Sequence, residues 1–529
     1  MAGLAVLSSG GAATLKPVAA LAAPSLPVKV ESALLEPIAL SLQNIITEGI
    51  TDVFRQPAEV DLLAKDVRFR NIVARRTLEV ISRGAHPSEC FSPLEFVDVP
   101  KRTYGAHRTC AVMDPLDAAA YLALVIAVAP TIERYRIPVE ERTIFSYRFA
   151  PNGGWLFDRD YRHAAFVEAV KSLRAQSKFM VQCDIAQFYP SLSPDIINDS
   201  LQYCKTDGKI TEQIRELSDF WSHEHAAGLP IGSNGSRILA EAALIRIDNA
   251  LRAEKINFVR FVDDFCLFSD DQETAERALQ ALQDVLASQK LHLNPEKTIK
   301  FAPAKAASSG SAPQGWELAK RPPVRVPPPN PHPYAGIGIP RKFRAATGKE
   351  IDRMKHAQQM NVSNFLDGEL VAPWLLRRAL RIAAYRNDVK FLRQIPELMM
   401  RYPECSEYIV SMLVHSSITI EKRTRREIAD KLSLMLLDRD TQTFVALQLL
   451  ELLATPTHER RSAIENYARV SMTTACGIRL RTALRALRLS GGIPDDISEA
   501  CLKADAPTIR TVLFETQISS LSSSNIARI

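Results

Sequence analysis

The sequence lacks the features that would place it among disulfide-rich, zinc-binding or membrane proteins. Its eight cysteines are scattered without a Cys-x-x-Cys pair, which indicates a reducing compartment and argues against a zinc module. We expect no apolar run long enough to span a membrane. Residues 1–30 are rich in Ala, Leu, Gly and Pro without a basic segment, so they predict a poorly ordered tail rather than a signal peptide.

The remaining composition is that of an ordinary globular protein with a mild positive charge. The 529 residues leave room for two or three domains, and 46% of them are hydrophobic. The formal net charge of +6 fits a partner that carries phosphate groups but does not require one.

One stretch concentrates the chemistry: Asn257-Phe-Val-Arg-Phe-Val-Asp-Asp-Phe-Cys-Leu-Phe-Ser269. Its β-branched and aromatic residues are typical of strands, and the adjacent Asp263 and Asp264 interrupt them at the centre. Two neighbouring carboxylates repel each other, and burial without partners would force protonation. The stretch predicts a β-hairpin with the Asp pair at its tip, either as a solvated turn or facing a divalent cation.

A further acidic residue, Asp184, lies upstream in a similar setting, at the end of a strand that begins near Lys178 and runs into a turn. Two strands that bring carboxylates to a common edge form a two-metal site, in which paired cations activate a 3′-hydroxyl and hold the departing pyrophosphate.

Four sequence blocks occur in the order and spacing of a reverse transcriptase palm. They are Asp184-Ile-x-x-Phe-Tyr-Pro-Ser191, Gly228-Leu-Pro-Ile-Gly-Ser-Asn-Gly-Ser236, Phe261-Val-Asp-Asp264 and Leu293-Asn-Pro-Glu-Lys-Thr298. The chain resembles a bacterial reverse transcriptase, and more narrowly the abortive-infection and defence-associated group. The resemblance implies DNA synthesis from dNTPs in antiphage defence, in the bacterial cytoplasm, on an RNA template or without one.

The resemblance also implies the residues of the site. Two Mg²⁺ ions, with Mn²⁺ as an alternative, would be held by Asp184, Ile185, Asp263 and Asp264, with Lys297 as a candidate general acid. The substrate would contact Lys101, Arg108, Ile185, Tyr189 and Gly232. The two basic groups would hold the triphosphate through charge-assisted hydrogen bonds, and Tyr189 would exclude a 2′-hydroxyl.

Two segments of the palm region depart from the common pattern or have no assigned role. Ile231 stands where many relatives carry a glutamine that hydrogen-bonds substrate and template, which favours relaxed or specialised synthesis. Phe145-Ser-Tyr-Arg148 is similar to a segment of the defence-associated group, and we assign it no role.

The expected fold is an α/β palm-and-fingers polymerase followed by an all-α, helical-repeat-like C-terminal domain. The expected divisions are a tail at 1–30, a helical region at 31–94, fingers and palm at 95–301, a Pro-rich linker or strap at 302–346, and stacked helical pairs at 347–529. Within the fingers, a helix is expected through Ala129.

The expected partners are dNTPs, an RNA template or associated non-coding RNA, and a DNA product, with no membrane. A homo-oligomer is compatible with the sequence. Members of the group can prime from a protein hydroxyl, for which Tyr385, Tyr402, Tyr408 and Tyr467 are candidates. The alternatives are a group II intron or retron type reverse transcriptase, an RNA-dependent RNA polymerase, and a non-catalytic RNA-binding scaffold. The intact set of three aspartates argues against the last.

Overall fold

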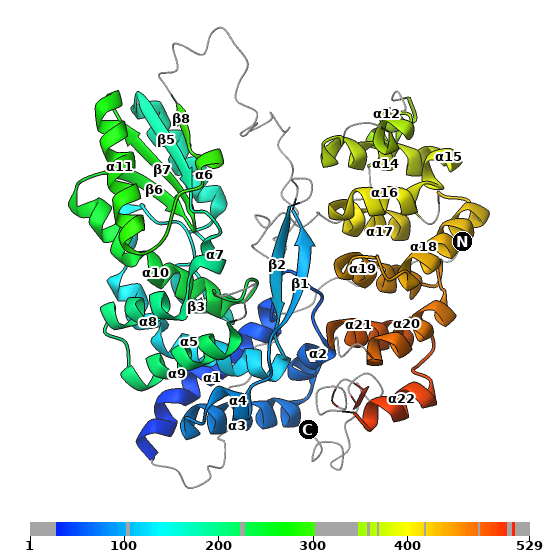
Figure 1. Cartoon of the computed structure of the whole chain (residues 1–529), viewed down its shortest axis with the longest axis horizontal. Helices are drawn as coiled ribbons and strands as arrows, with labels where there is room; N and C mark the ends of the chain where they lie inside the picture. Colours follow the sequence, from blue (N-terminus) through cyan, green and yellow to red (C-terminus); the bar gives the residue numbers. More distant parts are fainter. Residues whose placement is uncertain are drawn as a thin grey trace, which may run out of the picture.

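The computed structural model describes residues 28–101, 106–222, 228–301, 347–356, 360–367, 370–416, 419–473, 477–504, 510 and 512–513. Figure 1 shows a sheet with surrounding helices on one side, a column of C-terminal helices on the other, and a two-stranded ribbon between them. Of the expected tail, residues 1–27 lie outside the described part, and the expected linker at 302–346 lies wholly outside it.

The N-terminal region is helical, as its apolar stripes predict. It comprises α1 (Val28–Glu48), α2 (Ala58–Lys65), α3 (Val67–Arg83) and α4 (Pro87–Cys90). Apolar side chains of α1 and α3, among them Ile45 and Phe69, are fully buried in the same core as the helices of the palm.

The ribbon is an antiparallel pair, β1 (Glu95–Pro100) and β2 (His107–Val112), and it leads into α5 (Pro115–Tyr135). The prediction that this helix ends at Ala129 is wrong, because α5 continues through Pro130 for another turn and a half. It packs against α1, α3 and α10, and this burial outweighs the helix-breaking tendency of proline.

The expectation that no apolar run reaches the length of a membrane span is also wrong. In length and composition α5 is sufficient to cross a bilayer, with a mean hydropathy of 1.7. However, 83% of its apolar window is buried inside the protein, as in the core helix of a folded domain.

The central sheet has four strands in the order β6–β7–β5–β8, with all neighbours antiparallel. Its strands are β5 (Phe179–Asp184), β6 (Asn257–Phe261), β7 (Asp264–Ser269) and β8 (Ile299–Phe301). Alternate side chains point to opposite faces. One face packs on α6 (His163–Gln176), and the other on α10 (Asn234–Ala253) and α11 (Gln272–Ser288).

Shorter elements complete this body. They are η1 (Val139–Glu141), β3 (Phe149–Asn152), β4 (Trp155–Phe157), α7 (Phe188–Ser191), α8 (Pro194–Tyr203), α9 (Gly208–Trp221) and η2 (Pro295–Lys297).

The C-terminal residues form a stack of helices, as the sequence predicts. The elements are α12 (Gly348–His356), α13 (Ser363–Leu366), α14 (Pro373–Arg386), α15 (Val389–Leu392), α16 (Ile395–Arg401), η4 (Pro403–Cys405), α17 (Ser406–His415), α18 (Lys422–Leu437), α19 (Thr443–Leu453), α20 (Arg461–Thr473), α21 (Gly477–Leu489) and α22 (Asp495–Leu502). α17, α19 and α21 follow one another in one row, and α16, α18, α20 and α22 in the other (Figure 1). The helices therefore stack in pairs around their own core.

The helical stack docks on the ribbon and on the N-terminal helices. The Glu95 carboxylate accepts hydrogen bonds from the backbone N–H groups of Gly477 (2.8 Å) and Ile478 (3.0 Å) at the start of α21. Arg481 on the same helix contacts Glu59 at 3.2 Å and Asp114 at 3.0 Å. The docking thus pairs charges from three separate parts of the chain.

Candidate functional site

The three predicted aspartates meet at one edge of the central sheet. Asp184 is the last residue of β5, and in the antiparallel register it lies opposite Asp264, the first residue of β7. Asp263 occupies the two-residue turn that joins β6 to β7. The hairpin with the Asp pair at its tip is therefore confirmed. Its assignment as a metal site remains a prediction.

Backbone hydrogen bonds fix this edge. The N–H of Ile185 donates to the carbonyl of Asp263 (3.2 Å), which ties the end of β5 to the hairpin turn. On the other side the N–H of Asn294 donates to the carbonyl of Asp184 (2.7 Å). Ile185 is 1% exposed, so its side chain belongs to the core while its backbone lies at the site.

Electrostatics at the edge favour protonation of the Asp pair. Burial, followed by the negative charge of Asp184, raises the pKa of Asp263 to about 6. Burial and then the charges of Asp263 and Asp184 raise the pKa of Asp264 to about 7. Lys297 lowers the pKa of both carboxyls without cancelling these effects. Added positive charge at this edge would relieve the repulsion.

Lys297 is positioned by the turn that precedes β8. It ends η2, which Asn294 caps, and its Nζ lies 2.7 Å from Oδ2 of Asp184. The lysine side chain is 60% exposed, so the pair is screened by water and free to exchange partners.

The ribbon brings two further cations toward the carboxylates. Arg108 lies opposite Val99 in the β1–β2 register, and Lys101 follows β1, with its N–H bonded to the carbonyl of Ala106 at 2.8 Å. Desolvation and then the charges of Arg108 and Lys297 lower the pKa of Lys101, whereas Asp184 raises it. The fold therefore gathers Lys101, Arg108 and Lys297 within electrostatic range of one another.

Tyr189 lies on α7 directly after the Asp184 strand, and burial raises its pKa. Its carbonyl accepts a hydrogen bond from the N–H of Leu229 (3.0 Å), so the 228–232 loop runs along α7. Gly228 is required there, because a Cβ would lie 2.1 Å from the Tyr189 carbonyl oxygen.

The other end of this loop lies against the segment that follows α1. Gly232 has φ +118°, and a Cβ on it would lie 2.6 Å from Oγ1 of Thr51, in the segment that follows α1. Ile231 packs against an apolar cluster that includes Val53, Val97 and Phe444, and so reaches the C-terminal domain. The contact of Gly232 with substrate remains a prediction.

The donor chemistry of the edge suits a hard divalent cation, because all three side chains offer carboxylate oxygens. As the side chains stand, no group of three or more His, Cys, Asp or Glu within the described ranges converges to hold a metal ion. Asp184 is instead held by Lys297. The placement of the three aspartates and the raised pKa values of Asp263 and Asp264 fit a bound cation, provided that Asp184 releases Lys297 and binds the cation instead.

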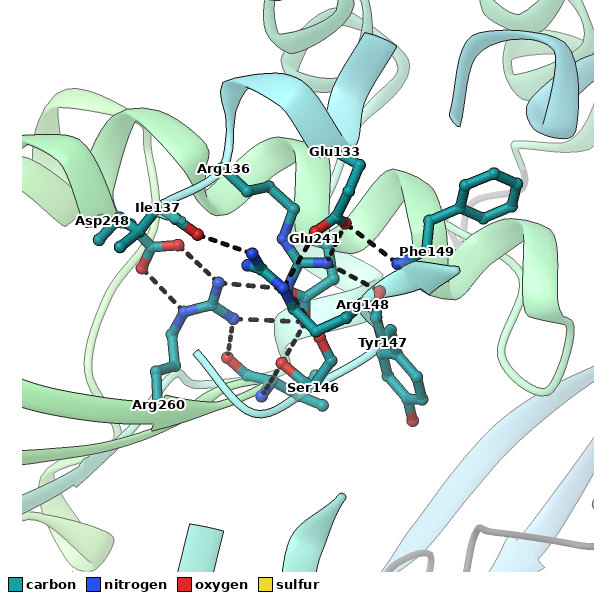
Figure 2. A network of polar contacts seen from close by, with 11 residues as sticks. Glu133, Arg136, Ile137, Ser146, Tyr147, Arg148, Phe149, Glu241, Asp248 and Arg260 are labelled. Carbon is teal, nitrogen blue, oxygen red and sulfur yellow. Dashed lines mark hydrogen bonds and ion pairs between the residues drawn. The ribbon is translucent and has the colours of Figure 1, made fainter. Parts of the chain in front are cut away.

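Sequence reasoning missed a buried polar network behind the hairpin (Figure 2). Arg260 on β6 is 0% exposed and contacts Glu241 and Asp248 on α10. Arg136 contacts the same Glu241 at 2.7 Å, and the Ser146 hydroxyl donates to it at 2.5 Å. The available signal was an arginine inside an apolar strand and two acids among the apolar residues of α10. Such groups must be paired if they are buried.

Comparison with known proteins assigns one part of the chain to a domain family. Residues 139–328 match the reverse transcriptase (RNA-dependent DNA polymerase) family, so this part of the chain carries a reverse transcriptase domain. No curated protein matches the chain.

Three solved structures of fungal telomerase show a weak likeness. The telomerase of Candida albicans in complex with a TWJ fragment of telomeric RNA is 12% identical with a TM-score of 0.30, and the alignment covers 68% of this chain and 66% of that one. The same type of complex from Candida tropicalis is 10% identical with a TM-score of 0.32, and the alignment covers 68% of this chain and 64% of that one. Apo telomerase from Candida tropicalis is 10% identical with a TM-score of 0.30, and the alignment covers 95% of this chain and 87% of that one. This chain thus spans just under two thirds of the first two, and likenesses this weak say nothing about what it binds.

Proposed function

We propose that this reverse transcriptase domain is catalytically active and transfers nucleotides from dNTPs to a growing DNA strand. The observation that carries the proposal is the meeting of Asp184, Asp263 and Asp264 at one sheet edge, opposite three cationic side chains from the ribbon and η2. An edge of carboxylates facing basic groups is the arrangement that a triphosphate with its metal ions requires.

Each residue then has a defined part in the reaction. Bound divalent cations would supply activation of the 3′-hydroxyl and neutralisation of phosphate charge. Asp184, Asp263 and Asp264 would hold them, while Arg108 and Lys101 orient the triphosphate. Lys297, released from Asp184, would donate a proton to the leaving pyrophosphate. Tyr189 would close the sugar pocket against a 2′-hydroxyl.

The finer assignment is a bacterial defence enzyme with specialised synthesis. It is supported by the four sequence blocks, by the C-terminal helical stack, and by Ile231, which packs toward that stack and has no amide to offer a template. RNA as template, Mg²⁺ as the metal and a cytoplasmic location belong to the same proposal.

Protein priming, which would leave the DNA product covalently attached, needs an accessible hydroxyl. Tyr402, Tyr408 and Tyr467 are buried, and the hydroxyl of Tyr408 donates to the carbonyl of Arg377. Tyr385 is only partly buried, so among the four candidates it is the one favoured by exposure.

The test is incorporation of labelled nucleotides by the purified protein, with its co-purifying nucleic acid and Mg²⁺. Wild type is compared with an Asp263→Ala, Asp264→Ala variant. We expect product from dNTPs, none from NTPs, and none from the variant. Label that stays with protein through phenol extraction, and is lost in Tyr385→Phe, would support protein priming. If neither dNTPs nor NTPs are incorporated, the proposed activity is wrong and the scaffold alternative gains support.

Single-nucleotide reactions distinguish the modes of synthesis. Product from one dNTP alone indicates untemplated synthesis. A product that requires all four dNTPs and disappears after RNase pretreatment indicates copying of an RNA template.

A further inference from the structure

We propose that Ser146 is a positioning residue, which holds the Asp263–Asp264 turn at the proposed metal-binding edge by connecting it to the buried ionic network shown in Figure 2. The inference rests on the proposed function, because it deepens the account of the same site. It also assigns a role to the Phe145-Ser-Tyr-Arg148 segment, which the catalytic groups do not include.

The turn needs an external restraint because of its first residue. Val262 has φ +57°, and it is the only β-branched residue among the non-glycine residues with positive φ in the described part of the chain. A side chain branched at Cβ is disfavoured there, and two-residue hairpin turns ordinarily place glycine or asparagine at such a position. Strain of this kind persists only where surrounding contacts enforce it, and it is common at functional sites.

Two hydrogen bonds hold Val262 in this conformation, one at its N–H and one at its carbonyl. Its N–H donates to the Ser146 hydroxyl at 2.9 Å, and its carbonyl accepts from Nη1 of Arg260 at 2.9 Å. Val262 as a whole is 3% exposed, so water cannot readily replace these partners. The next residue in the chain is Asp263, whose direction therefore depends on both bonds.

Ser146 acts as a connector because its hydroxyl both accepts and donates. It accepts from Val262 and donates to Oε1 of Glu241 at 2.5 Å. Its own carbonyl accepts from Nη2 of Arg136 at 2.7 Å, and the following carbonyl, of Tyr147, accepts from Nη1 of Arg136 at 2.7 Å. Hydrogen bonds therefore hold both the side chain and the main chain of Ser146 in place.

The network behind Ser146 contains as many basic as acidic side chains. Three arginines (Arg136, Arg148, Arg260) face three acids (Glu133, Glu241, Asp248) contributed by α5 and α10. Burial would raise the pKa of Glu241, but Arg260 and Arg136 outweigh it and keep the pKa below its ordinary value, so the carboxylate stays charged. A closed set of buried charges holds its members in one geometry, and Ser146 passes that geometry to the turn.

The decisive measurement is Mn²⁺ binding, followed through the loss of the free-ion signal in electron paramagnetic resonance. The variants are Ser146→Ala, the Asp263→Ala, Asp264→Ala pair, and Ser41→Ala as a matched control. Ser41 is equally buried at 0% exposed and also uses its hydroxyl, as donor to the Ala119 carbonyl, but in the α1–α5 core. Thermal unfolding of each variant reports the structural cost alone.

We expect wild type to bind Mn²⁺ in a manner that requires the Asp pair, Ser41→Ala to match it, and Ser146→Ala to bind ~10-fold or more weakly, as is usual when a partner behind a metal ligand is lost. Equal affinity in wild type and Ser146→Ala, equal losses in both serine variants, or absence of Asp-dependent binding would each overturn the inference.

If Ser146→Ala does not fold, the nearly isosteric Ser146→Cys replaces it, because a thiol is a weak donor and acceptor, and the same weakening is expected. Asp-dependent Mn²⁺ binding without any nucleotide incorporation would contradict the proposed function and leave this inference standing.

Discussion

The pair between Lys297 and Asp184 is a link that the reaction must break. We predict that Lys297→Ala slows nucleotide incorporation by ~10²-fold, in the range for a lost general acid. Its free energy of unfolding should change by less than about 1 kcal/mol, because the lysine is 60% exposed. Single-turnover incorporation and urea unfolding measure the two quantities.

The matched control is Lys300→Ala. Lys300 is 56% exposed and likewise makes one ion pair, with Glu276 at 3.6 Å, but it lies on β8 away from the carboxylates. Equal activities for the two lysine variants would remove Lys297 from the reaction.

His458, between α19 and α20, carries a pH dependence of stability. The residue is 0% exposed, and burial, followed by the charges of Arg425 and Arg460, lowers its pKa to about 4. A lowered pKa means that the folded state binds fewer protons than the unfolded state between about pH 6.5 and 4, so stability falls as pH drops through this window.

Between pH 7.5 and 5 the loss from this one group should be about 2 kcal/mol. His458→Gln should remove that part of the pH dependence, whereas His415→Gln, at an exposed position of the same domain, should keep it. Urea unfolding at the two pH values measures these free energies. The prediction is contradicted if the free energy of unfolding falls by the same amount between pH 7.5 and 5 in His458→Gln and in wild type.

At the scale of elements, the sequence predicts what depends on local pattern. The apolar strand with a central Asp pair gives the β6–β7 hairpin, and the helical periodicity gives the C-terminal stack. Prediction from sequence fails where tertiary burial decides the extent of an element, as in the continuation of α5 through Pro130. It also misses Ser146, Glu241 and Arg260, because their roles arise from contacts between residues more than 90 positions apart or across strand and helix.

The 228–232 loop offers a test of close approach at this scale. In Gly228→Ala the new Cβ would meet the Tyr189 carbonyl at 2.1 Å, so the loop must shift away from α7. We predict a loss of about 1–3 kcal/mol in the free energy of unfolding, as for overpacked sites, together with reduced incorporation. Gly208→Ala, at the start of α9 where nothing lies within 4 Å, should be neutral or slightly stabilising. Similar stability of the two alanine variants would show that the loop is not held against α7.

At the scale of the whole molecule, a few buried charges join the helical stack to the ribbon and to the N-terminal helices. The ribbon that carries Lys101 and Arg108 lies between the two bodies, and Glu95 on its first strand caps α21 (Figure 1). A shift of the stack would therefore shift the cations that face the aspartates. Sequence alone gave no indication of this coupling, because Arg481 reads as one of many arginines on polar helix positions.

Arg481→Ala tests that coupling. The arginine contacts Glu59 and Asp114, whose side chains are 2% and 5% exposed, so its removal leaves buried carboxylates with fewer partners. We predict a loss of about 3–5 kcal/mol in the free energy of unfolding, with faster amide exchange in α2 and α21. Arg469→Ala breaks the Arg469–Asp496 pair, whose side chains are 41% and 61% exposed, and should cost no more than about 1 kcal/mol. If both variants lose the same stability and exchange is unchanged, the stack is held by apolar contacts, in which its residue Phe444 joins Val97 of the ribbon in one cluster, rather than by these charges.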